Sequence, residues 1–168
     1  VLPLDKDSIT FTGPTQFQMG KSLNKTEVVE EQGTGAFASG DKKGQATFRT
    51  EYKLPYAVIG FNGIINEKAA QYSKMQEEDQ ALLMEGIWEG TKQLISRSKF
   101  GQTPLLLLSI TYKNPFYIGN LRQRLELVCE NDLKIRSISD YKLDVTALLH
   151  ALKKHKDQIA SIELQLDD

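Results

Sequence analysis

The sequence predicts an α+β protein whose 168 residues form a single domain, residues 1–168. Two observations support this fold class. Apolar residues alternate at period two in several short segments, as they do in strands, and one long segment between them repeats its apolar residues at helical spacing. A chain of this length can bury about 68–70% of its unfolded surface, so its core needs no disulfide or metal.

The first predicted strand covers Ser8–Gln18, in which Ile9 and Phe11 alternate with threonine. Gly13-Pro14 would break or kink this strand, because proline cannot donate a hydrogen bond to a strand ladder.

Residues Met19–Leu54 differ in character, being rich in Gly, Thr, Ser, Lys and Glu and poor in apolar side chains. Turn-forming pairs at Gly40-Asp41 and Lys43-Gly44 separate one arm near Val28-Val29 from a second at Gln45–Tyr52. We expect a long, protruding β-hairpin that contains too few core residues to fold alone.

Three regular elements should follow the hairpin. Leu54–Ile65 is apolar on both faces, which predicts a central, covered strand. Glu77–Ser98 has helical periodicity, with acids in its first turn and Arg97 and Lys99 at its end, as the helix macrodipole favours. Leu105–Tyr112 then predicts a buried strand.

The last third predicts a strand–helix–strand addition. Leu121–Cys129 can form a strand, and Asp144 is a suitable N-cap for a helix over Val145–His155. Ile159–Leu166 alternates cleanly as a final strand. The whole order of elements is similar to part of a ferredoxin-like sheet.

Composition excludes several classes of protein. The single cysteine, Cys129, excludes an internal disulfide framework and a four-cysteine zinc site. The longest apolar run, Leu105–Leu108, is far shorter than the roughly 18 residues that a membrane helix needs. Gly33-Thr34-Gly35 lacks the strand and helix of a dinucleotide loop. We therefore expect no cofactor. His150 and His155 lie five residues apart and would not share a helix face, so we expect no metal site either.

Net charge is 21 − 22 = −1, but its distribution is uneven. No Asp or Glu occurs from Gly90 to Leu125, a stretch that contains Lys92, Arg97, Lys99, Lys113, Arg122 and Arg124. Such asymmetry is typical of an anion-binding face, although chance clustering on a solvated surface would give the same pattern.

Two segments give the strongest functional signal. In Ser96–Gln102, Arg97 and Lys99 can contact phosphate, Ser98 can donate a hydrogen bond, and Phe100 can stack on a base. The alternative is a helix end with Phe100 in the core. The hairpin interleaves cations with aromatics, as proteins that bind single-stranded nucleic acid do, and the alternative is an ordinary loop. The hairpin residues concerned are Lys21, Lys25, Lys42, Lys43, Arg49, Lys53, Phe37 and Phe48.

Several ordered runs in Ser8–Tyr112 resemble a known family. They are SITFTGPTQF, SLNKTEVVEEQGTGAFAS, LPYAVIGFNGIINEKAA, LLMEGIWEGTKQLISRSKFGQ and LLLLSITY. These runs resemble the CRISPR-associated backbone ("seven") subunit of Cascade, a member of the RAMP superfamily in type I systems, with subtype I-B the most similar subgroup.

The resemblance implies an RRM-like palm with a β-hairpin thumb, here at about residues 19–54. It implies a non-catalytic, cytoplasmic protein that binds guide RNA (crRNA) whatever its sequence. Copies would repeat along the guide beside further Cascade subunits, target DNA would pair with the guide, and a separate nuclease–helicase would cut it.

The same resemblance assigns residues to the RNA. Lys21 and Ser22 would contact phosphate at the thumb base, while Gln32, Thr34 and Phe37 would hold a displaced base on the distal thumb. Residues 97–99 would line the guide groove. The family's first palm strand, first helix and fingers would precede Ser8, so we expect either an upstream half outside this sequence or a fragment that neighbouring subunits hold.

Two alternatives remain. A RAMP-superfamily endoribonuclease that processes guide RNA would need a general acid or base, for which His150, His155 and Tyr112 are the candidates. A protein-binding module would instead use the edge of the hairpin and would have no affinity for RNA.

Overall fold

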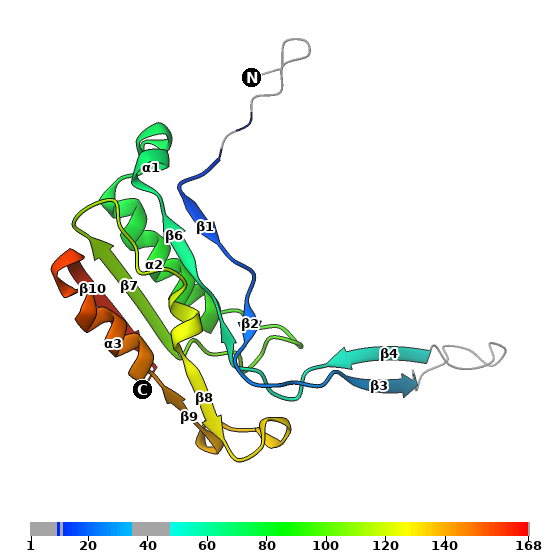
Figure 1. The fold of residues 1–168 in the computed structure, drawn as a ribbon. Coiled ribbons are helices and arrows are strands. Elements are labelled where there is room, and N and C mark those ends of the chain that lie inside the picture. Colours follow the sequence, from blue (N-terminus) through cyan, green and yellow to red (C-terminus); the bar gives the residue numbers. More distant parts are fainter. Residues whose placement is uncertain (1–9, 11, 35–47, 168) are drawn as a thin grey trace, which may run out of the picture. The chain divides into compact units, whose positions relative to one another are not determined.

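The computed structural model describes residue 10, residues 12–34 and residues 48–167 (Figure 1). The chain divides into two compact units. Unit 1 comprises Val1–Gln18, Gly63–Gly119 and Leu152–Asp168, and unit 2 comprises Met19–Asn62 and Asn120–Ala151. In the described residues every sheet is a two-stranded antiparallel pair, and helices accompany these pairs. The predicted α+β class is therefore confirmed, and the arrangement is compatible with an RRM-like fold; the single-domain description stays a prediction.

Unit 1 contains two strand pairs and two complete α-helices. Its elements are β1 (Thr15–Phe17), β6 (Gly63–Ile65), α1 (Glu67–Ser73), α2 (Glu77–Lys92), β7 (Leu106–Tyr112), η4 (Lys156–Gln158) and β10 (Ile159–Leu166). Strand β1 pairs with β6, and β7 pairs with β10 over almost its whole length. The predicted strands at 105–112 and 159–166 are thus confirmed, whereas α1, which is capped by Asn66, was not predicted.

The first strand is shorter than predicted, because it begins only after Gly13-Pro14. Ile9 and Phe11 lie outside the described residues.

Helix α2 begins at Glu77 as predicted but ends at Lys92, so the predicted end at Ser98 is wrong. The Thr91 hydroxyl donates to the Ile87 carbonyl at 2.7 Å, and the backbone then tightens into short turns after Gln93. Leu94 and Ile95, which follow the helix, are both exposed. Trp88 is only 2% exposed and is a core residue.

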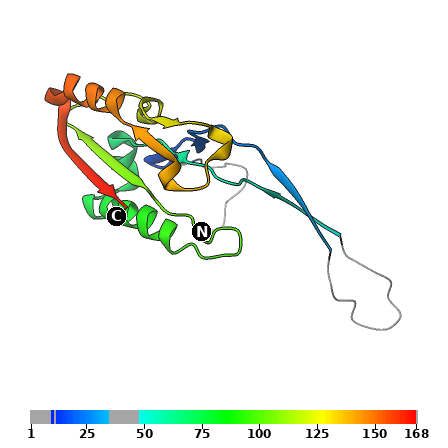
Figure 2. The same ribbon diagram turned by 90° about the horizontal axis from the view of Figure 1, so that it is seen from below.

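Unit 2 contains three strand pairs. Its elements are β2 (Lys21–Ser22), β3 (Val29–Thr34), β4 (Phe48–Lys53), β5 (Ile59–Gly60), η1 (Leu121–Arg124), β8 (Glu126–Cys129), η2 (Asp132–Lys134), η3 (Ile138–Asp140), β9 (Tyr141–Asp144) and most of α3 (Thr146–Lys154). Strand β3 pairs with β4, with Val29 opposite Lys53 and Thr34 opposite Phe48. Figures 1 and 2 show these arms side by side. The predicted hairpin arms are confirmed, and the predicted turns lie outside the described residues.

The prediction of one central, covered strand over 54–65 is wrong. The segment forms two short strands, β5 and β6, interrupted at Phe61-Asn62, and Ile59, Phe61 and Ile64 are exposed. At the interruption the Asn62 side chain accepts a long-range hydrogen bond from the Leu121 backbone N–H at 3.1 Å.

The C-terminal third is predicted in part. The first half of the strand predicted at 121–129 is the 3₁₀ turn η1, and β8 then pairs with β9, which was not predicted. Asp144 accepts a hydrogen bond from the Thr146 N–H at 2.7 Å and thereby caps α3 as expected. None of the described helices combines the length and apolarity that crossing a bilayer requires.

Two buried polar side chains, Asn24 and Arg122, join the segments on either side of the β3–β4 hairpin. The Asn24 amide oxygen accepts from the Val58 N–H at 2.9 Å, and its nitrogen donates to the Lys25 and Tyr56 carbonyls. The Arg122 guanidinium donates to the carbonyls of Met19 and Gly60 at 3.0 and 3.3 Å. Residues 19–25 are thereby tied to residues 56–60.

We expect Asn24→Ala to lower the free energy of unfolding by about 3 kcal/mol, because backbone groups of residues 25, 56 and 58 lose their partner. Urea denaturation checks this. The control is Gln32→Ala, an amide removed from an exposed strand position, which should change stability by less than about 0.5 kcal/mol. Equal losses in both variants would contradict the role assigned to Asn24.

Candidate nucleic-acid interface

The segment after α2 forms an exposed loop that carries two cations and an aromatic ring. We call Arg97–Phe100 the cationic loop; all four of its residues are exposed. The Ser96 carbonyl accepts hydrogen bonds from the N–H groups of Lys99 and Phe100 at 3.1 and 2.8 Å. Gly101 then turns the chain with a φ of +89°, a conformation that favours glycine. Phe100 is 80% exposed, so the alternative that places it in the core is wrong.

Strand β2 presents Lys21 and Ser22, and both residues are exposed. The Ser22 hydroxyl donates to the Asn24 amide oxygen at 3.0 Å. Contact between a phosphate oxygen and this hydroxyl as donor would therefore require that bond to break. Lys21 is the better candidate for a phosphate contact at this strand, and both assignments stay predictions.

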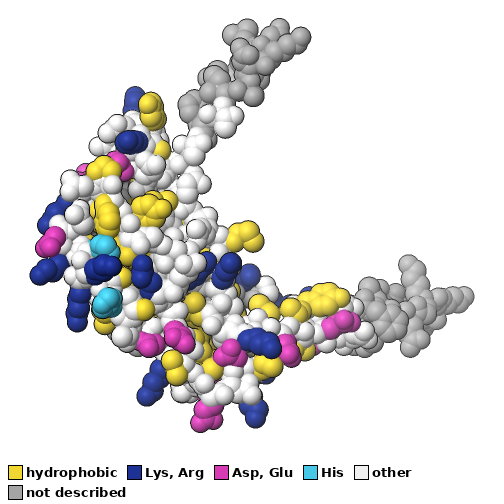
Figure 3. Space-filling model, viewed as in Figure 1, with side chains coloured by type: hydrophobic (Ala, Val, Ile, Leu, Met, Phe, Trp, Pro, Cys, Tyr) yellow, Lys and Arg dark blue, Asp and Glu magenta, His cyan; other side chains and the backbone are white. Residues whose placement is uncertain are grey.

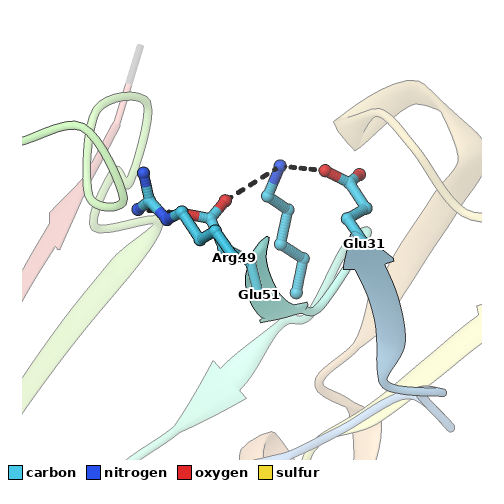
Figure 4. Close-up of polar contacts among 4 residues, drawn as sticks. Glu31, Arg49 and Glu51 are labelled. Carbon is cyan, nitrogen blue, oxygen red and sulfur yellow. Dashed lines mark hydrogen bonds and ion pairs between the residues drawn. The ribbon is translucent and has the colours of Figure 1, made fainter. Parts of the chain in front are cut away.

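One face of the β3–β4 ribbon carries charges that neutralise each other (Figure 4). Arg49 pairs with Glu51, and Lys53 bridges Glu31 and Glu51, the latter at 3.6 Å. Glu31 and Glu51 lie directly opposite each other, an arrangement that would be destabilising without Lys53. Residues 29–34 and 48–53 carry two bases and three acids, a net charge of 2 − 3 = −1. The described arms therefore provide no net attraction for phosphate.

The other ribbon face carries an exposed aromatic ring. The Gln32 amide donates to the Glu30 carboxylate at 3.2 Å, and Tyr52, opposite Glu30, is 70% exposed. Sequence reasoning missed Tyr52 as a candidate stacking residue, although alternation from Arg49 and Glu51 places it on the opposite face.

The remaining hairpin candidates have little or no description. Phe37, Lys42 and Lys43 lie outside the described residues, and Thr34 is known as the last residue of β3. The described candidates form two groups, the cationic loop in unit 1 and the β2 and ribbon residues in unit 2.

Two cations of the acid-free stretch serve the fold. Arg122 is 8% exposed and bonded to backbone carbonyls, and its stem lies where a side chain on Gly60 would stand. Lys92 pairs with Asp167 at 2.8 Å and lies 5.2 Å from the centre of the Trp88 ring. Charge counting along the sequence could not show which cations of the stretch contact other parts of the fold.

The candidate general acids and bases lie in different surroundings. His150 is exposed on α3, whereas His155 is half-buried with its ring 5.2 Å from that of Phe116. Phe116 in turn lies edge-on to Tyr112, whose hydroxyl accepts a hydrogen bond from the Ile118 N–H at 3.2 Å. Within the described ranges, no group of three or more His, Cys, Asp or Glu residues could hold a metal ion.

A carboxylate beside the ribbon base has a perturbed pKa. Asp132 accepts hydrogen bonds from the Cys129 thiol and the Lys25 N–H, both at 2.9 Å, and these lower the pKa of its carboxyl group, the thiol contributing most. The same contact raises the pKa of Cys129. Burial and the Tyr56 hydroxyl, 3.4 Å away, raise the pKa of the nearby Tyr141.

Arg122→Met should lower the free energy of unfolding by about 3 kcal/mol, because two carbonyls lose their donor. Lys99→Gln, the control, should change it by less than about 0.5 kcal/mol, since Lys99 is an exposed cation of the same acid-free stretch. Chemical denaturation of both variants measures the difference. A destabilisation by Lys99→Gln as large as that by Arg122→Met would contradict the structural role assigned to Arg122.

Asp132 should also make stability depend on pH. A carboxyl group with a lowered folded-state pKa stabilises the protein above its unfolded pKa, and this contribution is lost as pH falls through the folded value. Asp132→Asn should therefore reduce the loss of stability between neutral pH and about pH 3, measured by denaturation at each pH. Some loss should remain, because the Thr146 side chain and N–H lower the pKa of Asp144 similarly. If the stability of Asp132→Asn fell as steeply with falling pH as that of the parent protein, the role assigned to Asp132 would be contradicted.

Comparison with known proteins identifies the family of this chain. A family model described as "CRISPR-associated protein Cas7" matches residues 1–146. The chain is 31% identical over 159 residues to a CRISPR-associated protein Cas7 of Haloferax volcanii, an alignment that covers 92% of this chain and 47% of that protein. The chain therefore spans about half the length of the curated relative that it matches. This chain belongs to the Cas7 family of CRISPR-associated proteins.

Proposed function

We propose that this chain is a non-catalytic RNA-binding subunit in the backbone of a type I CRISPR surveillance complex. It would hold guide RNA independently of sequence, repeat in several copies along that RNA, and contact further subunits of the complex. Its contribution to antiviral defence would be to present the guide for pairing with target DNA, while cleavage would belong to a separate enzyme.

One observation carries this proposal. The cationic loop exposes a guanidinium, an ammonium, a hydroxyl and an aromatic ring within four consecutive residues, inside the acid-free stretch from Gly90 to Leu125. Cations and hydroxyls contact phosphate, and an exposed ring stacks on any unpaired base because every base has a π-face. Both kinds of contact tolerate any sequence. Family membership supports the same role.

The ribbon would contribute to RNA binding through its length. Each described arm has six paired residues, which extend about 20 Å. Because the described ribbon residues have no net positive charge and Arg49 is paired with Glu51, affinity would come from the cationic loop and from Lys21 rather than from Arg49. The hairpin cations Lys42 and Lys43 would add to that affinity.

We also propose that the ribbon is the thumb and that Gln32, Tyr52 and Phe37 face displaced bases. The exposure of the Tyr52 ring supports this assignment, because a ring that no neighbour covers is available for stacking. Tyr52 lies opposite Glu30, so the ring stands on the face away from the Arg49, Glu51 and Lys53 charges.

The rival function, guide-RNA processing, has weaker support. The ring of Phe116 lies between Tyr112 and His155, and the Tyr112 hydroxyl is bonded to backbone. A general acid–base pair would need both groups within reach of one phosphate. Cleavage that is lost when His150, His155 and Tyr112 are replaced would favour the enzyme instead.

Replacing Arg97 and Lys99 together with glutamine should weaken RNA binding about tenfold at moderate salt and lower the salt dependence of the binding constant, because two phosphate contacts are lost. The loss should be equal for single-stranded RNAs of unrelated sequence, which filter binding or fluorescence anisotropy measures.

The control variant replaces two exposed cations of the same unit, Lys68→Gln in α1 with Lys74→Asn at its C-cap. Asparagine suits the left-handed conformation of Lys74, whose φ is +58°. RNA affinity should stay unchanged in this control. A loss confined to one RNA sequence, or an equal loss in the control, would contradict the proposal.

A further inference from the structure

A second basic cluster lies mostly outside the part of the chain that the Cas7 family model covers. The match ends at residue 146, whereas Lys153 and Lys154 occupy the last turn of α3 and Lys156 begins η4. Lys113, which follows β7, joins them because its N–H donates to the Gln158 carbonyl at 2.9 Å. We call these four lysines the α3 lysine cluster. Figure 3 shows Lys and Arg side chains gathered near the two histidines.

The charge of this cluster is not compensated locally. All four lysines are exposed, and none forms an ion pair with any residue that the structure describes. Asp157 is the one acid between Lys153 and Gln158, so the cluster has a net charge of 4 − 1 = +3. The helix macrodipole accounts for Lys153 and Lys154 at the end of α3, but it does not account for Lys113 and Lys156, which come from other segments.

We propose that the α3 lysine cluster binds the sugar–phosphate backbone of double-stranded DNA, at a site separate from the cationic loop. Lysine is depleted in protein interfaces and abundant at phosphate contacts, so a nucleic acid fits this cluster better than an acidic protein does. Phe116 and His155 are half-buried against each other, so neither ring presents an open face to an unpaired base. A duplex keeps its bases stacked inside and presents its phosphates outward, which matches a surface of exposed ammonium groups.

The test uses the protein at its full encoded length and measures two affinities separately. The probes are a short mixed-sequence DNA duplex and a single-stranded RNA. Lys153→Gln with Lys156→Gln should weaken duplex binding about tenfold and reduce the slope of log K against log salt by about two. Binding of single-stranded RNA should stay unchanged. The Lys68→Gln, Lys74→Asn control should retain both affinities, and thermal unfolding should show that each variant is folded.

Unchanged duplex affinity in the Lys153, Lys156 variant, or a parent protein that does not bind duplex, would overturn the proposal. Loss of a protein component from the purified complex, with duplex affinity intact, would also overturn it and would identify an acidic protein as the partner. Failure of the parent to bind single-stranded RNA would contradict the proposed function alone, because the duplex assay is independent of it.

Discussion

The hairpin depends on two buried polar side chains that tie its two ends together. Asn24 and Arg122 satisfy backbone groups of residues 19–25 and 56–60, the segments from which the two arms leave and to which they return. A two-stranded ribbon has only marginal stability in water by itself, so it depends on contacts at the base of its two arms. The same network makes Asn24 a structural residue, because its amide nitrogen already donates to two carbonyls.

The charges of the ribbon stabilise its paired arms, whereas the attraction of phosphate depends on other residues. Arg49, Glu51, Lys53 and Glu31 satisfy one another along one face, which stabilises the paired arms without attracting phosphate. Attraction is left to cations on exposed segments, such as the cationic loop and the α3 lysine cluster. A surface of this kind can hold a polyanion by charge and by stacking without reading its sequence, which suits the proposed role of holding a guide of any sequence.

Sequence patterns predicted correctly those elements that depend mainly on neighbouring residues. Strict alternation located the last strand at Ile159–Leu166, and the acids before the apolar stripe located the start of α2. Apolarity on both faces misled at 54–65, where the segment is interrupted at Phe61-Asn62 and its two short strands pair separately with β2 and β1. Long-range hydrogen bonds from Leu121 and Arg122 reach Asn62 and Gly60 in the same segment. The structural role of Arg122 could not be predicted either, because the sequence does not distinguish a buried arginine from an exposed one.

The measurement that tests the central claim most directly is size-exclusion chromatography of the full-length protein from its own cells, with absorbance read at two ultraviolet wavelengths and nuclease applied to the peak. We predict a large species rich in RNA that shrinks or dissociates after ribonuclease treatment. A small species free of nucleic acid, which also fails to bind added RNA, would contradict the claim that this chain is a guide-binding backbone subunit.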